Sequence, residues 1–163
     1  MTPALRLTPM GLRAFGRRIP CTIGRGGLSG DKREGDGATP RGTHRIVAMF
    51  HRAERMRAPV AWSRAIGPAD LWSDDMRDPA YNTLVRAPHS FSHERLRRGD
   101  RLYDLVMVLD WNWPHARPGR GSAIFLHRWR RAGAPTEGCI AVAPEDLVWI
   151  ARRIRPGQRL RVP

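Results

Sequence analysis

The sequence predicts a single, mainly β domain with one or two short helices that spans residues 1–163. Short apolar runs of strand length recur along the chain, and segments containing glycine or proline separate most of them. Only one segment has clear helical periodicity. A chain of this length can bury about two-thirds of its unfolded surface, so it needs neither a disulfide nor a structural metal to fold. We find no sequence repeat and no domain boundary.

The apolar runs place the expected strands in order along the chain. Between the third and the fourth run, residues 52–82 carry Trp, Pro and Asp with weak periodicity, and we expect a long, structured loop region there. The expected strands are ALRLTP (4–9), RRIPCTIG (17–24), HRIVAMFH (44–51), LYDLVMVLDWN (102–112), AIFLH (123–127), GCIAV (138–142) and QRLRVP (158–163).

The clear helix is expected in PEDLVWIARRI (144–154). Pro144 suits the first turn, and the acidic Glu145 and Asp146 suit the positive end of the helix dipole. A second, shorter helix is expected in SHERLRR (92–98), where the first serine can cap the first turn. The first helix is expected to stop at the Pro-Gly pair 156–157. The apolar face of this helix comprises Leu147, Ile150, Ala151 and Ile154.

The charge balance predicts an anionic partner. The formal net charge is +14, and Lys32 is the only lysine among the 29 basic residues. Nearly all of the positive charge is therefore on arginine, whose planar guanidinium suits carboxylates and phosphates. The arginines are scattered along the chain, with no nucleic-acid-binding motif and no basic tail. This distribution argues against nucleic acid as the main partner.

The sequence contains no segment with the pattern of a membrane-spanning helix. No apolar run approaches the roughly 20 residues needed to cross a bilayer. Residues 1–18 alternate polar and apolar positions and lack the continuous apolar core of a secretory signal peptide. We therefore expect that export, if it occurs, is arranged otherwise, or that this is a mature form.

His127 ends one apolar run and Cys139 begins the next, and together they form a candidate catalytic pair. Taken separately, each fits a structural role, the cysteine as a small buried residue and the histidine as a hydrogen-bonded one. The interval between them contains Gly-Ala-Pro, which allows a turn that brings two strand ends together. A thiolate nucleophile needs a base within hydrogen-bond reach. The peptide N–H groups around Gly138 and Cys139 would then face a developing oxyanion.

The glycine-rich segment 24–44 has two interpretations. It is not a phosphate-binding loop, because Asp31 separates Gly30 from Lys32. Its SGDK (29–32) has the Ser-x-x-Lys spacing of penicillin-binding enzymes, but the flanking glycines disfavour the helix that this motif needs. The segment is either a flexible surface hairpin or, over residues 32–43, one wall of a cleft.

We expect neither a metal nor an organic cofactor. His89 and His93 are four residues apart, but the H-E-x-x-H order and an acidic third ligand are lacking. Cys21 and Cys139 are too far apart in sequence to form a metal-spaced cluster, and nothing in the sequence supports a disulfide between them.

Two segments together resemble the L,D-transpeptidase (YkuD-like) catalytic domain. They are ATPRGTHRI (38–46) and TEGCIAV (136–142), and His127 lies between them in the order that the family shows. The resemblance extends over residues 5–162 and implies a β-sandwich or β-barrel fold. It also implies a cell-wall enzyme on the periplasmic or wall side of the membrane, whose substrates are anionic peptidoglycan stem peptides.

The resemblance also implies roles for individual residues. Cys139 would be the nucleophile that forms a thioester, His127 its base, and the carbonyl of Arg128 the group that orients the base. Gly138 and Cys139 would contribute to the oxyanion hole. This chemistry uses no metal and no cofactor.

The chain departs from the family pattern around the cysteine. Glu137 stands where the family has a second histidine, and Ala141 stands where an arginine is common. The interval before the cysteine is also shorter, and WNWPHARPGRGS (111–122) leaves little room for a helical lid. Another arginine, either Arg25, Arg33 or Arg128, would then hold the substrate carboxylates. The residues expected around the substrate are Arg25, Arg33, Thr39, Trp129, Thr136 and Glu137.

Three functions remain open at this point. The first is a transpeptidase that forms 3–3 or 1–3 cross-links, depending on which L–D junction of the stem peptide supplies the acyl group. The second keeps the same site but uses water, as an L,D-carboxypeptidase or a cysteine peptidase. The third is a basic module that binds cell wall or nucleic acid and has an inert Cys139.

Overall fold

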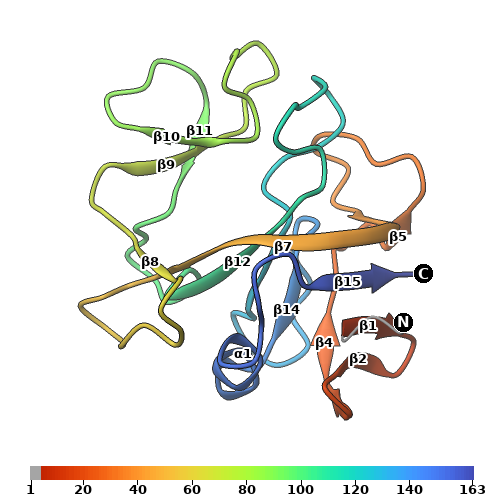
Figure 1. Cartoon of the computed structure of the whole chain (residues 1–163). Helices are drawn as coiled ribbons and strands as arrows, with labels where there is room; N and C mark the ends of the chain where they lie inside the picture. Colours follow the sequence, from red (N-terminus) through yellow and green to blue (C-terminus); the bar gives the residue numbers. More distant parts are fainter. Residues whose placement is uncertain (1–4) are drawn as a thin grey trace.

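The computed structural model describes residues 5–163, and strands dominate it (Figure 1). The elements are, in chain order, β1 (Leu5–Thr8), β2 (Gly11–Ala14), β3 (Arg17–Ile19), β4 (Cys21–Thr22), β5 (Leu28–Ser29), β6 (Thr39–Pro40), β7 (Gly42–His51), β8 (Arg64–Ala65), β9 (Asp70–Ser73), β10 (Leu84–Arg86), β11 (His93–Arg95), β12 (Leu105–Leu109), β13 (Phe125–Arg128), β14 (Ile140–Val142), α1 (Pro144–Ala151) and β15 (Arg159–Val162). The predicted fold class is confirmed.

The main sheet curls until its two ends almost meet. Its strand order is β3-β2-β1-β15-β7-β12-β13-β14-β4, and β8 pairs with β7 beside this path. The strands at the two ends, β3 and β4, are separated in the chain by Pro20 alone. The sheet is therefore nearly closed and resembles a barrel, and its long strand β7 pairs with β15 near its start and with β12 over the rest of its length (Figure 1).

The central strand β12 divides the core into two parts. All five of its residues are buried. Leu105, Met107 and Leu109 pack into one apolar cluster, whereas Val106 and Val108 pack into the other. This division follows from the alternation of side chains along a strand. Burying each of these side chains contributes roughly 1.5–3 kcal/mol.

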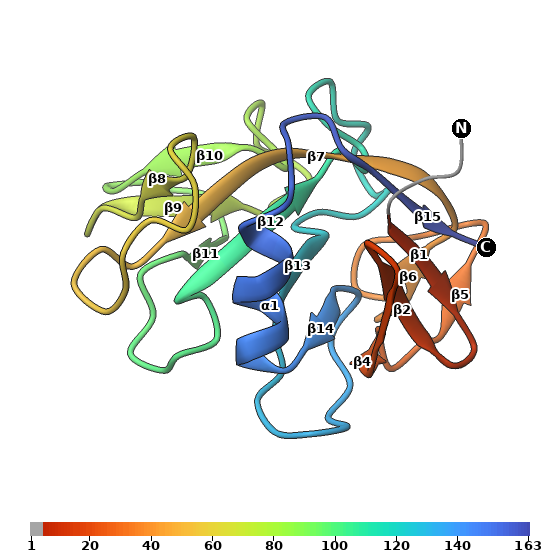
Figure 2. The same cartoon turned by 60° about the horizontal axis from the view of Figure 1, so that its bottom comes forward.

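Helix α1 covers the first of these clusters (Figure 2). It starts at Pro144 with Glu145 and Asp146 in its first turn, as predicted. It packs against β12 and β13 and buries Leu147 and Ile150. The helix ends at Ala151, three residues before the expected end. Ile154, which lies beyond this end and was predicted on the apolar face, is nevertheless buried. Within residues 5–163, no helix is long and apolar enough to cross a membrane.

A second, smaller sheet corrects two predictions. Its order is β10-β9-β11, and it lies beside the barrel (Figure 1). The predicted helix in residues 92–98 is wrong, because His93–Arg95 forms β11 and Glu94 pairs with Trp72 of β9. The region 52–82 is mostly loop but contains the buried strand β9. Cross-strand pairing outweighs the local helical preference of this segment.

Candidate active site

The parallel pairing of β13 and β14 places His127 and Cys139 on the same face of the sheet. His127 is level with Ala141, and Leu126 is level with Ile140. Side chains alternate along a strand, so Cys139, two residues before Ala141, shares the face of His127. Phe125 and Cys139 both pack into the second apolar cluster, and Leu126 and Ile140 into the first. Both candidate residues line the same cavity.

The Cys139 thiol is held by main-chain groups. Its Sγ donates to the carbonyl of Ala123 at 3.2 Å and accepts from the N–H of Phe125 at 3.4 Å. Ala123 has a positive φ of 52°, a conformation that is uncommon outside glycine. Burial raises the pKa of the Cys139 thiol to about 12, so the sulfur is protonated at neutral pH.

The carbonyl of the next residue orients the His127 ring. Its Nδ1 lies 2.6 Å from the carbonyl oxygen of Arg128. A carbonyl only accepts hydrogen bonds, so Nδ1 carries the proton and Nε2 presents its lone pair. Burial lowers the pKa of His127 to about 4, and the charges of Arg98 and Arg130 act in the same direction. The ring is therefore neutral at pH 7. It packs against the Tyr103 ring in a T-shaped arrangement, with the ring centroids 5.5 Å apart.

A threonine connects the turn before Cys139 to the glycine-rich segment. Thr39 Oγ1 accepts from the N–H of Gly24 at 2.9 Å and donates to the carbonyl of Gly138 at 2.8 Å. A side chain at position 24 would place its Cβ 2.1 Å from the carbonyl oxygen of Gly37. Only glycine fits there, because the two backbones are in close contact.

A second threonine shapes the turn itself. Thr136 Oγ1 donates to the carbonyl of Cys139 at 2.6 Å and accepts from the N–H of Gly138 at 3.1 Å. The N–H of Gly138 is thus already engaged. Within residues 5–163, the N–H of Cys139 has no hydrogen-bond acceptor. Cys139 N–H, rather than Gly138 N–H, is available for an oxyanion.

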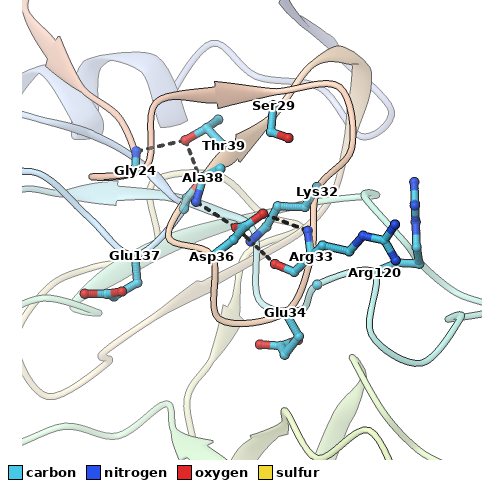
Figure 3. A network of polar contacts seen from close by, with 12 residues as sticks. Gly24, Ser29, Lys32, Arg33, Glu34, Asp36, Ala38, Thr39, Arg120 and Glu137 are labelled. Atoms are coloured by element: carbon cyan, nitrogen blue, oxygen red, sulfur yellow. Dashed lines mark hydrogen bonds and ion pairs between the residues drawn. The ribbon is translucent and has the colours of Figure 1, made fainter.

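The glycine-rich segment is ordered by Asp36 (Figure 3). The Asp36 carboxylate accepts from Lys32 Nζ at 2.5 Å and from the backbone N–H groups of Arg33 and Ala38, both at 2.8 Å. Lys32 is only 2% exposed, although lysine side chains usually lie at the surface. The interpretation as a flexible hairpin is therefore wrong. Lys32 and Glu34 line the cavity, as the alternative interpretation of residues 32–43 requires.

The cavity measures about 390 Å³ and has walls from distant parts of the chain. Three of the predicted substrate contacts, Trp129, Thr136 and Glu137, line it. Sequence reasoning missed several further lining residues, because none of them belongs to a recognisable motif. They are Asp74, Glu94, Tyr103 and Ala123.

The other predicted substrate contacts lie elsewhere. Thr39 is fully buried behind the turn. Arg25 forms an ion pair with Glu137 at 2.9 Å, and Arg33 forms one with Asp31 at 3.0 Å. Neither arginine lines the cavity. The side chain of Arg128 borders a smaller neighbouring hollow of about 200 Å³.

Cys21 and the metal-like histidines are separate from this site. Cys21 and Cys139 are both free thiols. Burial raises the pKa of Cys21 to about 11, and the residue lies in β4. His89 Nε2 lies 2.6 Å from Asp78, while His93 Nδ1 faces the carbonyl of Phe91. Among residues 5–163, no group of three potential ligands could hold a metal ion.

Comparison with known proteins identifies the family. The family model described as the L,D-transpeptidase catalytic domain (YkuD) matches residues 13–162. No curated protein matches the chain. A solved L,D-transpeptidase structure from Mycobacterium smegmatis aligns over 99% of this chain and 59% of that chain, with 14% identity and a TM-score of 0.44. The match of the family model over nearly the whole length shows that this chain belongs to the L,D-transpeptidase catalytic domain family.

Proposed function

We propose that the chain is a cysteine-dependent L,D-transpeptidase that cross-links peptidoglycan stem peptides through an acyl-enzyme. The observation that carries this proposal is that Cys139 and a neutral His127 line the same cavity, where the Arg128 carbonyl leaves Nε2 as the free acceptor. We place its site of action on the periplasmic or wall side of the membrane, where peptidoglycan lies.

The first half-reaction transfers the acyl group to sulfur. The thiol proton moves from its hydrogen bond with Ala123 to Nε2 of His127, which requires rotation of the Cys139 side chain. The sulfur attacks the carbonyl of an L–D peptide bond, and the N–H of Cys139 stabilises the oxyanion. The C–N bond then breaks, and the imidazolium returns its proton to the leaving amine. The product is a thioester.

The second half-reaction releases the acyl group. An amine from a neighbouring stem peptide attacks the thioester, its proton passes to Nε2, and the sulfur leaves as a thiolate that regains the proton. Attack by water on the same thioester gives the L,D-carboxypeptidase reaction. Both 3–3 and 1–3 cross-links are compatible with this scheme, because the Cys-His pair recognises the junction and the surrounding cavity selects its position.

An adduct experiment tests the nucleophile. We expect one equivalent of a carbapenem to add to the wild-type chain and to Cys21→Ala, and no addition to Cys139→Ala, as measured by intact-protein mass. Both cysteines are free thiols with raised pKa values, so Cys21→Ala is a matched control. An unmodified wild-type protein with a free thiol would instead support the basic binding module.

Product analysis tests the reaction. Incubation with purified disaccharide-tetrapeptide and disaccharide-tripeptide should give cross-linked dimers. Release of D-Ala with dimer formation indicates a 3–3 product, and release of a peptide beginning with D-Glu indicates a 1–3 product. Release of D-Ala without any dimer contradicts the transpeptidase and supports the carboxypeptidase.

A further inference from the structure

Two segments that are far apart in the chain carry positive charge without any acidic residue. Residues 5–30 and 147–163 contain five arginines each and neither aspartate nor glutamate. The pairing of β1 with β15 brings these segments side by side in the main sheet, and β2 lies next to β1 (Figure 2). The fold therefore gathers the acid-free segments at one end of the sheet.

Arginines on these strands line up across the sheet. Arg6 of β1 lies opposite Arg13 of β2 on one side and beside Arg161 of β15 on the other. Arg13 in turn lies opposite Arg18 of β3. Residues in register point to the same face of a sheet, and all four arginines are exposed. These four residues form a continuous arginine row across four neighbouring strands.

The protein does not neutralise the arginine row. Among residues 5–163, no carboxylate forms an ion pair with any member of the row, nor with Arg159 and Arg45, which pair with each other beside it. Arginines near the small sheet differ, as Arg77 shows by its ion pair with Asp75 at 2.9 Å. Like charges directly opposite each other on a sheet are destabilising, so the row is suited to an anionic partner.

A tryptophan next to β3 holds two further arginines. The guanidinium carbons of Arg17 and Arg153 lie 4.2 and 4.1 Å from the centroid of the Trp149 ring. Phe15 packs against the same indole in a T-shaped arrangement. With three side chains packed on it, Trp149 leaves little ring surface on which a nucleic-acid base could stack. The site therefore supplies charge without a stacking platform.

We propose that the arginine row binds a flexible linear polyanion whose backbone charges are phosphodiester groups and which carries no bases. Neighbouring strands lie about 4.8 Å apart, so the row suits an anion that repeats at short intervals. The planar guanidinium can bond a phosphate through two N–H groups. The nearly closed sheet curves across its strands, so a flexible chain can follow the row, whereas a flat bilayer meets only part of it. No member of the row lines the cavity of Cys139, so this surface is separate from the proposed active site.

Direct binding to a defined polymer tests the arginine row. The probe is a fluorescein-labelled synthetic oligo(glycerol phosphate), titrated with the full chain at several salt concentrations and followed by fluorescence anisotropy. We expect replacement of all four row arginines by Gln to weaken binding by at least about tenfold and to reduce the dependence of log Kd on log salt by about 3, because four phosphate contacts are lost. The double variant Arg13→Gln, Arg18→Gln should show about half of this reduction.

The control removes the same charge elsewhere on the surface. It replaces four exposed arginines of the region 52–86 and should retain most of the affinity, because distant charges are screened by salt. Thermal unfolding and carbapenem addition to Cys139 verify that each variant is folded. The control substitutions are Arg57→Gln, Arg64→Gln, Arg77→Gln and Arg86→Gln.

Three other anions separate a phosphodiester polymer from the alternatives. They are an oligothymidylate with the same number of phosphates, poly-L-glutamate of the same charge, and vesicles of phosphatidylcholine with phosphatidylglycerol. We expect the oligo(glycerol phosphate) to bind at least as tightly as the oligothymidylate and more tightly than poly-L-glutamate, and vesicle binding to be the same in the row and control variants.

Four results would overturn the proposal. Tighter binding of the oligothymidylate would assign the face to nucleic acid, and equal binding of poly-L-glutamate would remove the preference for phosphodiesters. Vesicle binding that depends on the row, without polymer binding, would assign the face to a bilayer. Equal affinities of the row and control variants would show that the row is not the binding surface. Carbapenem addition should be the same in the wild type and the row variant, so failure of this proposal leaves the proposed function intact.

Discussion

The two walls of the cavity are built in different ways. The wall that carries Cys139 and His127 belongs to the main sheet, where strand register sets the position of each side chain. The wall that carries Glu34, Asp74 and Glu94 comes from the glycine-rich loop and from the region of the small sheet. The first wall places Cys139 and His127 on or beside paired strands, whereas the second brings together acidic residues from three segments that are distant in sequence. Strand register therefore fixes the first wall, and long-range packing fixes the second.

The largest effect should come from the sheet-borne wall. We expect His127→Gln to lower the rate of acyl-enzyme formation by two to four orders of magnitude, roughly the contribution of general base catalysis. The control is His44→Gln. His44 is also buried, its pKa is lowered by burial, and its Nε2 lies 3.0 Å from the carbonyl of Pro40, but it does not line the cavity. Equal losses in both variants would mean that His127 acts structurally.

The same histidine should make stability depend on pH. Its folded-state pKa of about 4 lies below the usual value of 6.5, so the unfolded chain binds the proton first. Stability due to this group is therefore full above pH 6.5 and falls as the pH drops toward 4, by about 3 kcal/mol. Urea unfolding of the wild type and His127→Gln over this range measures the difference. Parallel pH curves for the two proteins would contradict the buried, neutral state of His127.

Thr39 joins the two walls, and its hydroxyl should stabilise the fold. Thr39→Val keeps the shape but leaves Gly24 N–H without its acceptor and Gly138 carbonyl without its donor. We expect a loss of roughly 1–3 kcal/mol in the free energy of unfolding. Thr22→Val is the matched control, because Thr22 Oγ1 is buried without a hydrogen-bond partner, and its removal should be neutral or stabilising. Urea denaturation measures both variants. A larger loss of stability in Thr22→Val than in Thr39→Val would contradict the role of Thr39.

The smallest effect should come from the ion pair at the rim. Arg25 and Glu137 have side chains that are 55% and 79% exposed, so water and salt screen their attraction. We expect Glu137→Gln to change the free energy of unfolding by less than about 1 kcal/mol. Thermal unfolding at low and high salt measures this. A large, salt-sensitive loss would show that the rim, as well as Thr39, holds the two walls together.

The same contrast explains which features were predictable from the sequence. Most strands of the main sheet were predicted, because their apolar residues either form continuous runs or alternate with polar residues. The Cys139 turn was found because its residues are adjacent in the chain. Strand β9 was missed because its two ends, Asp70 and Ser73, are buried polar residues, which leaves only two apolar residues between them. The helix expected in residues 92–98 was wrong, because residues 93–95 pair with β9 instead. A contact between segments so distant in sequence leaves no local signal.

The carboxylates of the second wall could not be predicted for a related reason. Glu34, Asp74 and Glu94 are each surrounded by polar residues, and nothing local distinguishes them from solvent-exposed acids. Their common feature is that they line one cavity, which depends on how distant segments pack in the folded chain. Arg25 and Arg33 show the same limit, since both were expected at the substrate and both pair with nearby acids.

The pairing of β1 with β15 has a consequence for how the chain folds. Leu5 lies opposite Leu160, and β15 also pairs with β7, so residues 159–162 join the first hairpin to the rest of the sheet. Contacts so distant in sequence carry a large loop-closure entropy, and folding is expected on the order of milliseconds to seconds. Until those residues leave the ribosome, β1 and β7 each present an open strand edge, which favours pairing with other chains.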